Sequence, residues 1–161
     1  MTAAVDFAPT EKVYQMNSDV FEMQATILGV TEVQKKKNDD GGDLVPALVL
    51  DKTIFHAQGG GQPSDVGLIV SEDGEMRFEV SFVKNENSVL YHTGHFVADG
   101  EHNFCVGTEV TLQIDREKRE LHSRIHSAGH ALDCALASLA KAGNKTAAEL
   151  VPTKGYHFPG R

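Results

Sequence analysis

Two histidines spaced four residues apart, His126 and His130, are the side chains in this sequence best suited to metal chemistry. In a helix, residues four apart lie on one face, about 6 Å from each other, so two imidazoles can bind one metal ion without distorting the backbone. A tetrahedral zinc needs one or two further protein ligands, with an open position for water if it is catalytic. Spacing alone leaves two interpretations open: half of a metal site, or a pair of solvent-facing helix histidines.

The same stretch offers His122 and Cys134 as further ligands on the same side of the expected helix. Cys134 follows His126 by eight residues, which is roughly 12 Å along a helix axis. His126 and Cys134 therefore cannot both join His130 around one zinc, and the remaining ligands must come from elsewhere. The sequence identifies no catalytic side chain.

Three consecutive glycines, Gly59-Gly60-Gly61, precede Gln62 and form a second candidate site. Glycine adopts positive φ freely and lets a ligand or another backbone approach closely. The stretch is not a phosphate-binding P-loop, because the Lys-Ser/Thr ending is missing. A rigid structural turn and a binding loop both remain open. A third stretch, Lys154-Gly155-Tyr156-His157-Phe158, has by itself the pattern of an ordinary loop leading into a strand.

The elements that must position these residues change in character near residue 115. Before it, Val-, Ile- and Thr-rich segments separated by polar turns predict six or so short strands, which suggests a small barrel or sandwich. The expected strands are 21–34, 44–50, 68–70, 76–84, 88–91 and 108–114. After Asp115, a plausible N-cap, apolar residues recur at three- and four-residue steps over about seven turns, until Gly143-Asn144 ends the helix.

Composition limits the function. The 161 residues are 40% hydrophobic and 24% charged, as expected for one or two compact domains, and no segment resembles a signal peptide or a membrane helix. We therefore expect a cytoplasmic protein with free thiols and no membrane partner. A net charge of −8 argues against a protein that holds RNA mainly through a broad positive surface. RNA contacts should be local, at Lys35-Lys36-Lys37 or in the basic stretch 116–124, although an isolated lysine triplet more often only solvates a loop.

Taken in order, these motifs resemble the AlaX proteins, which are freestanding relatives of the alanyl-tRNA synthetase editing domain. The sequence is also similar to the editing domain of threonyl-tRNA synthetase. The resemblance spans roughly residues 21–161. It rests on the ordered segments Phe55–Gly67, Ile114–Arg116, Arg124–Asp133 and Lys154–Phe158.

The resemblance implies an α+β fold: a small N-terminal β-barrel carrying the glycine-rich motif over residues 1–114, then the helix-led start of an α/β editing domain over 115–161. It implies hydrolysis of the ester that joins Ser or Gly to alanine tRNA, with the tRNA acceptor end as partner. The family's cofactor is Zn²⁺, with two ligands here at His126 and His130. In the family the other ligands are a Cys and a His from well downstream, and this sequence reaches Arg161 before any such pair. We therefore expect only a half-site, in a fragment of a longer protein rather than a natural short form.

The resemblance also implies a set of substrate- and tRNA-binding positions. They are Gly59, Gly60, Gly61, Gln62, Gly129, Thr153, Lys154 and Gly155. Thr153 matches a position near the family's editing pocket, and Gly129 stands where synthetase relatives often carry Thr. Because a pocket separates Ser from Ala best by hydrogen-bonding the hydroxyl, both positions bear on amino-acid preference.

Two other functions remain open from the sequence. The first is a non-catalytic RNA-binding or assembly module that keeps the editing fold without a complete metal site. A downstream Cys-x-x-x-His pattern would favour the enzyme, and its absence from the full gene product would favour the module. The second is a β-rich domain with incidental histidines.

Overall fold

A computed structural model describes residues 6–34, 43–97 and 104–150. Contacts divide the chain into two compact units. The first contains Met1–Gln58 and Ser64–Arg116, and the second contains Gly59–Pro63 and Glu117–Arg161. The domain boundary expected after residue 114 stays a prediction, because compactness alone does not show which part of a chain folds independently.

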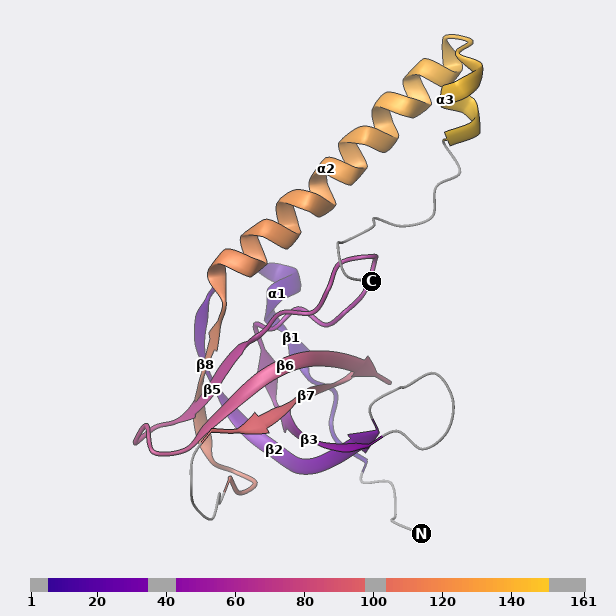
Figure 1. The fold of residues 1–161 in the computed structure, drawn as a ribbon. Coiled ribbons are helices and arrows are strands. Elements are labelled where there is room, and N and C mark those ends of the chain that lie inside the picture. The colour runs from indigo at the N-terminus through magenta and orange to yellow at the C-terminus, as the bar shows by residue number, and fades with distance from the viewer. Residues whose placement is uncertain (1–5, 35–42, 98–103, 151–161) are drawn as a thin grey trace. The chain divides into compact units, whose positions relative to one another are not determined.

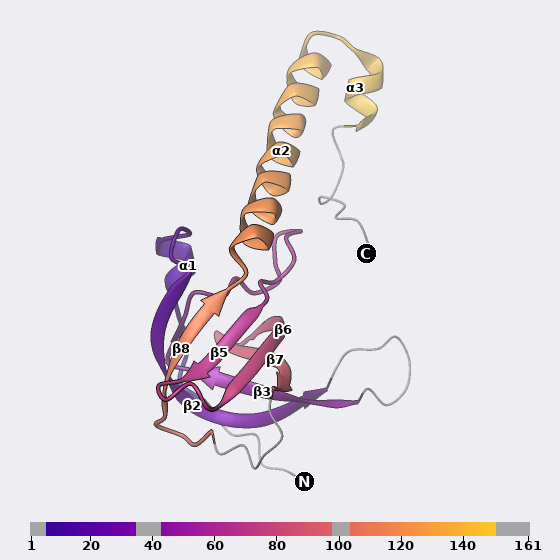
Figure 2. The same cartoon turned by 60° about the vertical axis from the view of Figure 1, so that its left-hand side comes forward.

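The first unit is a closed six-stranded barrel in the order β2-β3-β7-β6-β5-β8, and Figures 1 and 2 show its strands from two sides. All six neighbouring pairs are antiparallel. The strands are β2 (Glu22–Gln34), β3 (Leu44–Leu50), β5 (Gly67–Ser71), β6 (Arg77–Glu86), β7 (Val89–Phe96) and β8 (Glu109–Ile114). The expected α+β fold with a small N-terminal barrel is therefore confirmed.

Alternation of apolar and polar residues explains which face of each strand is buried. In β8, Val110, Leu112 and Ile114 are buried, whereas Glu109 and Gln113 are exposed. Successive side chains of a strand point to opposite faces, so this alternation closes the barrel around one core. The core includes Ile27, Leu48, Phe55, Phe78, Leu90 and Leu112, all fully buried.

Short elements precede the glycine-rich motif. Strand β1 (Glu11–Lys12) pairs in parallel with β4 (Lys52–Thr53), and the single turn α1 (Val13–Met16) follows β1. The parallel pair ties the N-terminal segment to the residues that run into the motif. Sequence patterns did not predict these elements, because two- and four-residue segments are too short to show a period.

His92 lies inside the barrel and is bonded to Thr53, shortly before the glycine-rich motif. Its side chain is fully buried in β7, with Nδ1 3.1 Å from the carbonyl oxygen of Leu48 and Nε2 2.8 Å from the Thr53 hydroxyl. The backbone N–H of Phe55 donates to the same hydroxyl at 3.1 Å. One arrangement satisfies every group: Nδ1–H donates to Leu48, and Nε2 accepts from Thr53. The network therefore fixes β3, β4 and β7 together.

Acid should destabilise the barrel through His92. Burial lowers the pKa of His92 to about 4, against an ordinary value of about 6.5. Between these values the unfolded chain binds a proton that the folded chain does not, so stability is complete above about pH 6.5 and falls as the pH drops towards 4. We expect a loss of about 3 kcal/mol, measured by urea unfolding at several pH values.

Two variants test the assignment to His92. His92→Leu removes the titrating group, so its lower stability should vary little between pH 7 and pH 4.5. His95→Gln alters an exposed histidine of the same strand and should keep the full wild-type pH dependence. A pH dependence that persists in His92→Leu would assign the effect to other groups.

The second unit contains helix α2 (Arg116–Lys141) from Glu117 onwards, and a short helix α3 (Lys145–Leu150). The 26 residues of α2 make about seven turns, as the sequence predicts, and Figure 1 shows one continuous rod. Gly143, at φ 92°, ends it: its N–H donates to Ala140, and the N–H of Asn144 donates to Leu139, a Schellman pattern. No described helix is long and apolar enough to cross a membrane.

Candidate functional site

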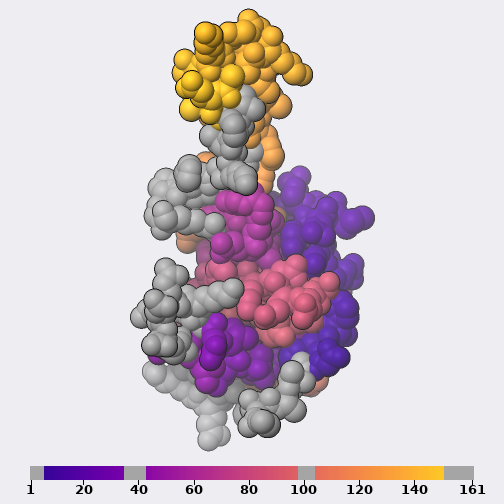
Figure 3. Space-filling model, turned by 90° about the vertical axis from the view of Figure 1, so that its right-hand side faces the viewer, coloured from indigo at the N-terminus to yellow at the C-terminus, as the bar shows by residue number. Residues whose placement is uncertain are grey.

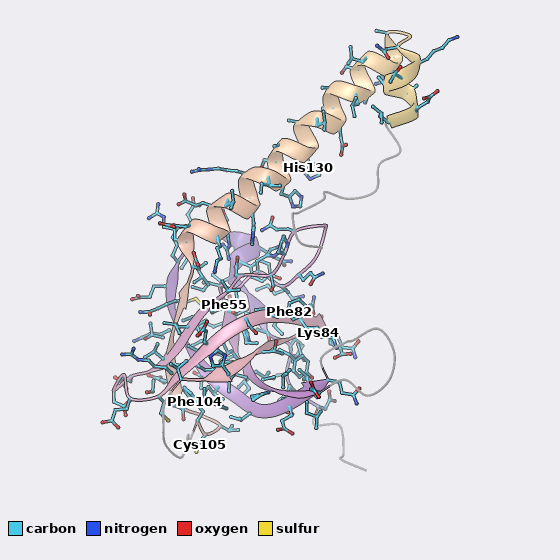
Figure 4. The ribbon with its side chains drawn as sticks, in the orientation of Figure 1. Phe55, Phe82, Lys84, Phe104, Cys105 and His130 are labelled. Atoms are coloured by element: carbon cyan, nitrogen blue, oxygen red, sulfur yellow. The ribbon has the colours of Figure 1, made fainter. Side chains whose placement is uncertain are left out.

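His126 and His130 face each other on α2. Their Nε2 atoms are 2.9 Å apart, and their ring centroids are 4.8 Å apart with an interplanar angle of 39°. Figure 4 labels His130 on the helix. The four-residue spacing places both rings on one face, as the sequence predicts. At this distance one Nε2 carries a hydrogen and the other accepts it, so the two nitrogens converge on one point.

The geometry of this pair fits two ligands of one zinc ion. Two imidazole nitrogens bound to a tetrahedral zinc at about 2.0–2.1 Å lie roughly 3.3 Å from each other. The observed 2.9 Å separation would have to open by only a few tenths of an ångström. Both side chains are at least partly exposed, so an ion can reach them. The spacing of the two nitrogens is therefore compatible with two ligands of one metal ion.

Among the described residues, His126 and His130 are joined by no third possible metal ligand. No group of three or more His, Cys, Asp or Glu side chains able to hold a metal ion occurs among residues 6–34, 43–97 and 104–150. His122 and Cys134 therefore complete no cluster with His126 and His130, in agreement with the helix geometry. The expectation that further ligands come from elsewhere stays a prediction.

The glycine-rich motif forms a tight turn in the same compact unit as α2. Gly59 and Gln62 exchange two backbone hydrogen bonds of 3.2 and 3.0 Å, and between them Gly60 and Gly61 have φ values of 58° and 85°. Positive φ at both central residues defines a type I′ turn, which favours glycine. A Cβ built on Gly60 would lie 3.7 Å from Cε1 of His126. The turn therefore lies beside His126, and Gly60 adds no side chain there.

The base of this loop is fixed within the barrel unit. The backbone N–H of His56 donates to Oδ2 of Asp65 at 2.6 Å, and the N–H of Asp65 donates to the carbonyl of His56 at 3.0 Å. Asp65 is 2% exposed. The N–H of Gln58 donates to the carbonyl of Val83 in β6 at 3.1 Å. These bonds set where the chain leaves the barrel and returns.

Gly60→Val should destabilise the turn, because a β-branched residue at φ 58° carries a strain of about 1–2 kcal/mol. The built Cβ meets only an ordinary contact, so the strain comes from the backbone and not from a clash. Gly60→Asn is the matched control, since Asn adopts this conformation readily. In urea unfolding we expect a loss for Val and near wild-type stability for Asn. Equal stability of Gly60→Val and wild type would contradict the assigned turn.

The remaining predicted site residues fall into three groups. Gln62 is buried at the end of the turn, at 8% exposure, and Gly129 lies on α2 directly before His130. Thr153, Lys154 and Gly155 lie outside the described residues. The structure adds Asp65 and His92 as residues that position the loop. No sequence pattern predicts either role, because Asp65 bonds to a backbone N–H and His92 bonds to residues of other strands.

Comparison with known proteins adds the following similarities. The model of the family described as tRNA synthetases class II (A) matches residues 2–118. An alanine–tRNA ligase of Methanobrevibacter smithii is 35% identical over 126 residues, 78% of this chain and 13% of the ligase. An alanyl-tRNA editing protein AlaX-M of Methanosarcina barkeri is 32% identical over 125 residues, 76% of this chain and 45% of that protein.

An alanine–tRNA ligase of Saccharolobus islandicus is 32% identical over 148 residues, 91% of this chain and 15% of the ligase. Because so little of the chain lies outside this match, the match necessarily includes His126 and His130, whereas the family model ends at residue 118. The chain spans less than half the length of each of these three relatives.

Proposed function

Because this chain belongs to the family of class II (A) tRNA synthetases and is similar to alanine–tRNA ligases and to an AlaX-M alanyl-tRNA editing protein, we propose that it is part of a tRNA-editing deacylase. The reaction is hydrolysis of the ester that joins Ser or Gly to alanine tRNA. The observation that carries the proposal is the convergent pair His126 and His130, beside a glycine turn, in a chain with this similarity.

His126 and His130 would hold a zinc ion through their Nε2 atoms, together with ligands from outside the described residues. When bound, zinc can polarise the ester carbonyl and lower the pKa of a bound water to about 7. The two imidazoles must be neutral to serve as ligands, and their existing convergence limits the reorganisation that binding requires.

The glycine turn would admit the aminoacyl ester. With only hydrogen atoms at Gly60 and Gly61, no side chain from these two positions covers the face of the turn next to His126. The two backbone bonds between Gly59 and Gln62 close the turn in one conformation. A fixed turn lowers the entropic cost of orienting the ester for attack by water.

Deacylation of mischarged tRNA tests the proposal directly. The full-length gene product should hydrolyse Ser or Gly from alanine tRNA faster than it hydrolyses Ala from the same tRNA. Serine tRNA carrying Ser is the matched control, because the amino acid is the same and only the tRNA differs, and it should remain charged. Release of no amino acid from alanine tRNA by a folded, full-length protein would reject the proposal.

A further inference from the structure

A groove of about 750 Å³ lies on the barrel unit, against β2, β3, β6 and β7. Figure 3 faces this side, with the end of β6 and the start of β7 (salmon) above β3 (purple). Apolar surface comes from Val33, Val45 and Phe82, and hydrogen-bonding groups come from the side-chain amides of Gln58 and Asn85. The size is within the range of sites for small organic ligands, roughly 300–1,000 Å³.

A β-bulge turns Phe82 out of the core and into this groove. Val80 pairs with Gly94 and Phe82 pairs with Thr93, so Ser81 is an extra residue in β6. The Thr93 hydroxyl donates to the carbonyl of Phe82 at 3.0 Å and stabilises the bulge. Phe78 and Val80 point inwards, and strict alternation would place Phe82 inside as well.

Because of the bulge, Val83 takes the inward position and Phe82 is 37% exposed. Bulges commonly redirect a side chain next to a functional site. Placing an aromatic ring on the surface gives up the burial that would stabilise the fold. Phe82 therefore presents an apolar ring to the groove that Val33 and Val45 also line.

The charge of the groove differs from the charge of the whole chain. Its described lining contains Lys84 and no carboxylate, although the chain as a whole has a net charge of −8. Lys84 Nζ lies 2.8 Å from Oε2 of Glu86, whose side chain is 53% exposed. An exposed ion pair contributes little, so Lys84 can exchange Glu86 for an anionic ligand at small cost. The second surface hollow, by contrast, is lined by Glu72, Asp73 and Glu109.

We propose that this groove binds unpaired nucleotides of the substrate RNA, an inference that rests on the proposed function. A base stacks on Phe82, the amides of Gln58 and Asn85 bond to base edges, and Lys84 contacts a phosphate. Aromatic rings beside a cation are the usual means of holding single-stranded nucleic acid. Phe82 and Lys84 lie near each other along β6 (Figure 4).

A peptide is a poorer occupant of the groove. Extended peptides gain most of their affinity by adding a strand to an open sheet edge, and the six strands of this barrel close on themselves.

Fluorescence anisotropy of the full-length protein with a labelled single-stranded RNA hexamer tests the groove. We expect Phe82→Ala to weaken the Kd by about 5- to 100-fold, the effect of losing one stacked base. Phe82→Tyr keeps an aromatic face and should stay within about twofold of wild type. Val106→Ala alters an equally apolar, exposed side chain that does not line the groove and should leave the Kd unchanged.

A second variant, Lys84→Gln, keeps the proposal testable if Phe82→Ala folds poorly. It should reduce the slope of log Kd against log salt by about 0.7, the value for one phosphate contact to a single strand. A blunt-ended RNA duplex of equal length should bind at least about tenfold more weakly than the hexamer, because its bases cannot stack on a side chain. Wild-type hexamer binding in both Phe82→Ala and Lys84→Gln would overturn the proposal.

Parallel deacylation assays separate the two proposals. Hexamer binding that depends on Phe82, in a protein that releases no amino acid from alanine tRNA, would reject the editing function and keep the groove. If the protein releases Ser or Gly from alanine tRNA, but its hexamer binding is unchanged in Phe82→Ala and Lys84→Gln, the editing function is kept and the groove is rejected.

Discussion

His126→Ala in the full-length gene product is expected to abolish both zinc retention and deacylation of alanine tRNA carrying Ser. The variant removes one of two nitrogens that converge to 2.9 Å on α2. Even residues that only support a metal ligand typically change affinity or activity by 10–100-fold, so losing a ligand should cost at least about 100-fold in rate. Zinc content by mass spectrometry and single-turnover deacylation measure the two effects separately.

His122→Ala is the matched control for His126→Ala. It lies one turn earlier on α2 and is also partly exposed, but it belongs to no group able to hold a metal ion among the described residues. It should keep both zinc and activity. Wild-type turnover in His126→Ala would remove zinc from the proposed mechanism.

Asp65→Ala is expected to destabilise the barrel by about 1–3 kcal/mol and to reduce deacylation along with it. Asp65 is 2% exposed, and its carboxylate accepts the backbone N–H of His56 at 2.6 Å. Removing the acceptor leaves that N–H without this partner, and an unsatisfied buried donor costs about 1–3 kcal/mol. Urea unfolding and deacylation of alanine tRNA carrying Ser measure the two effects.

Asp65→Asn separates the hydrogen bond from the charge. The amide oxygen can still accept from His56, so most of the stability should return, with a deficit no larger than about half that of Asp65→Ala. Glu72→Ala, a change at an exposed carboxylate, should alter stability by less than about 0.5 kcal/mol. If Asp65→Ala lost no more stability than Glu72→Ala, the loop base would not depend on this hydrogen bond.

Strong periodicity made most of the fold predictable. The alternation in β8 and the three- and four-residue steps of α2 each extend over enough residues to specify an element. Strand β7 was expected to end at Tyr91 but extends to Phe96. The polar residues His92 and Thr93 hide the second half of β7 from an apolar pattern. His92 is bonded inside the barrel to Leu48 and Thr53, and the Thr93 hydroxyl donates to the carbonyl of Phe82.

Helix α3 was missed for a local reason. The sequence pattern places Gly143-Asn144 at the end of α2 and predicts no element directly after it. Asn144 also caps the next helix, with Oδ1 accepting the N–H of Ala147 at 3.0 Å. Because the same residue ends α2 and begins α3, the sequence shows the end of one helix but no separate start signal for the next.

The site was predictable only where residues act through local spacing. Convergence of His126 and His130 follows from the helix repeat, and positive φ at Gly60 agrees with the absence of a side chain. The turn type depends on pairing of Gly59 with Gln62, and the outward position of Phe82 depends on a bulge opposite β7. Both features arise from strand register, which one sequence does not show.

Zinc content of the full-length gene product, purified without added metal and then dialysed against a chelator, tests the central claim most directly. We expect about one zinc per chain to be retained, and deacylation of alanine tRNA carrying Ser to be lost when stronger chelation removes it. The 161-residue chain, with two ligands from His126 and His130, should lose its zinc on dialysis. A folded, zinc-free full-length protein that binds tRNA without deacylating it would contradict this account and indicate a non-catalytic RNA-binding module.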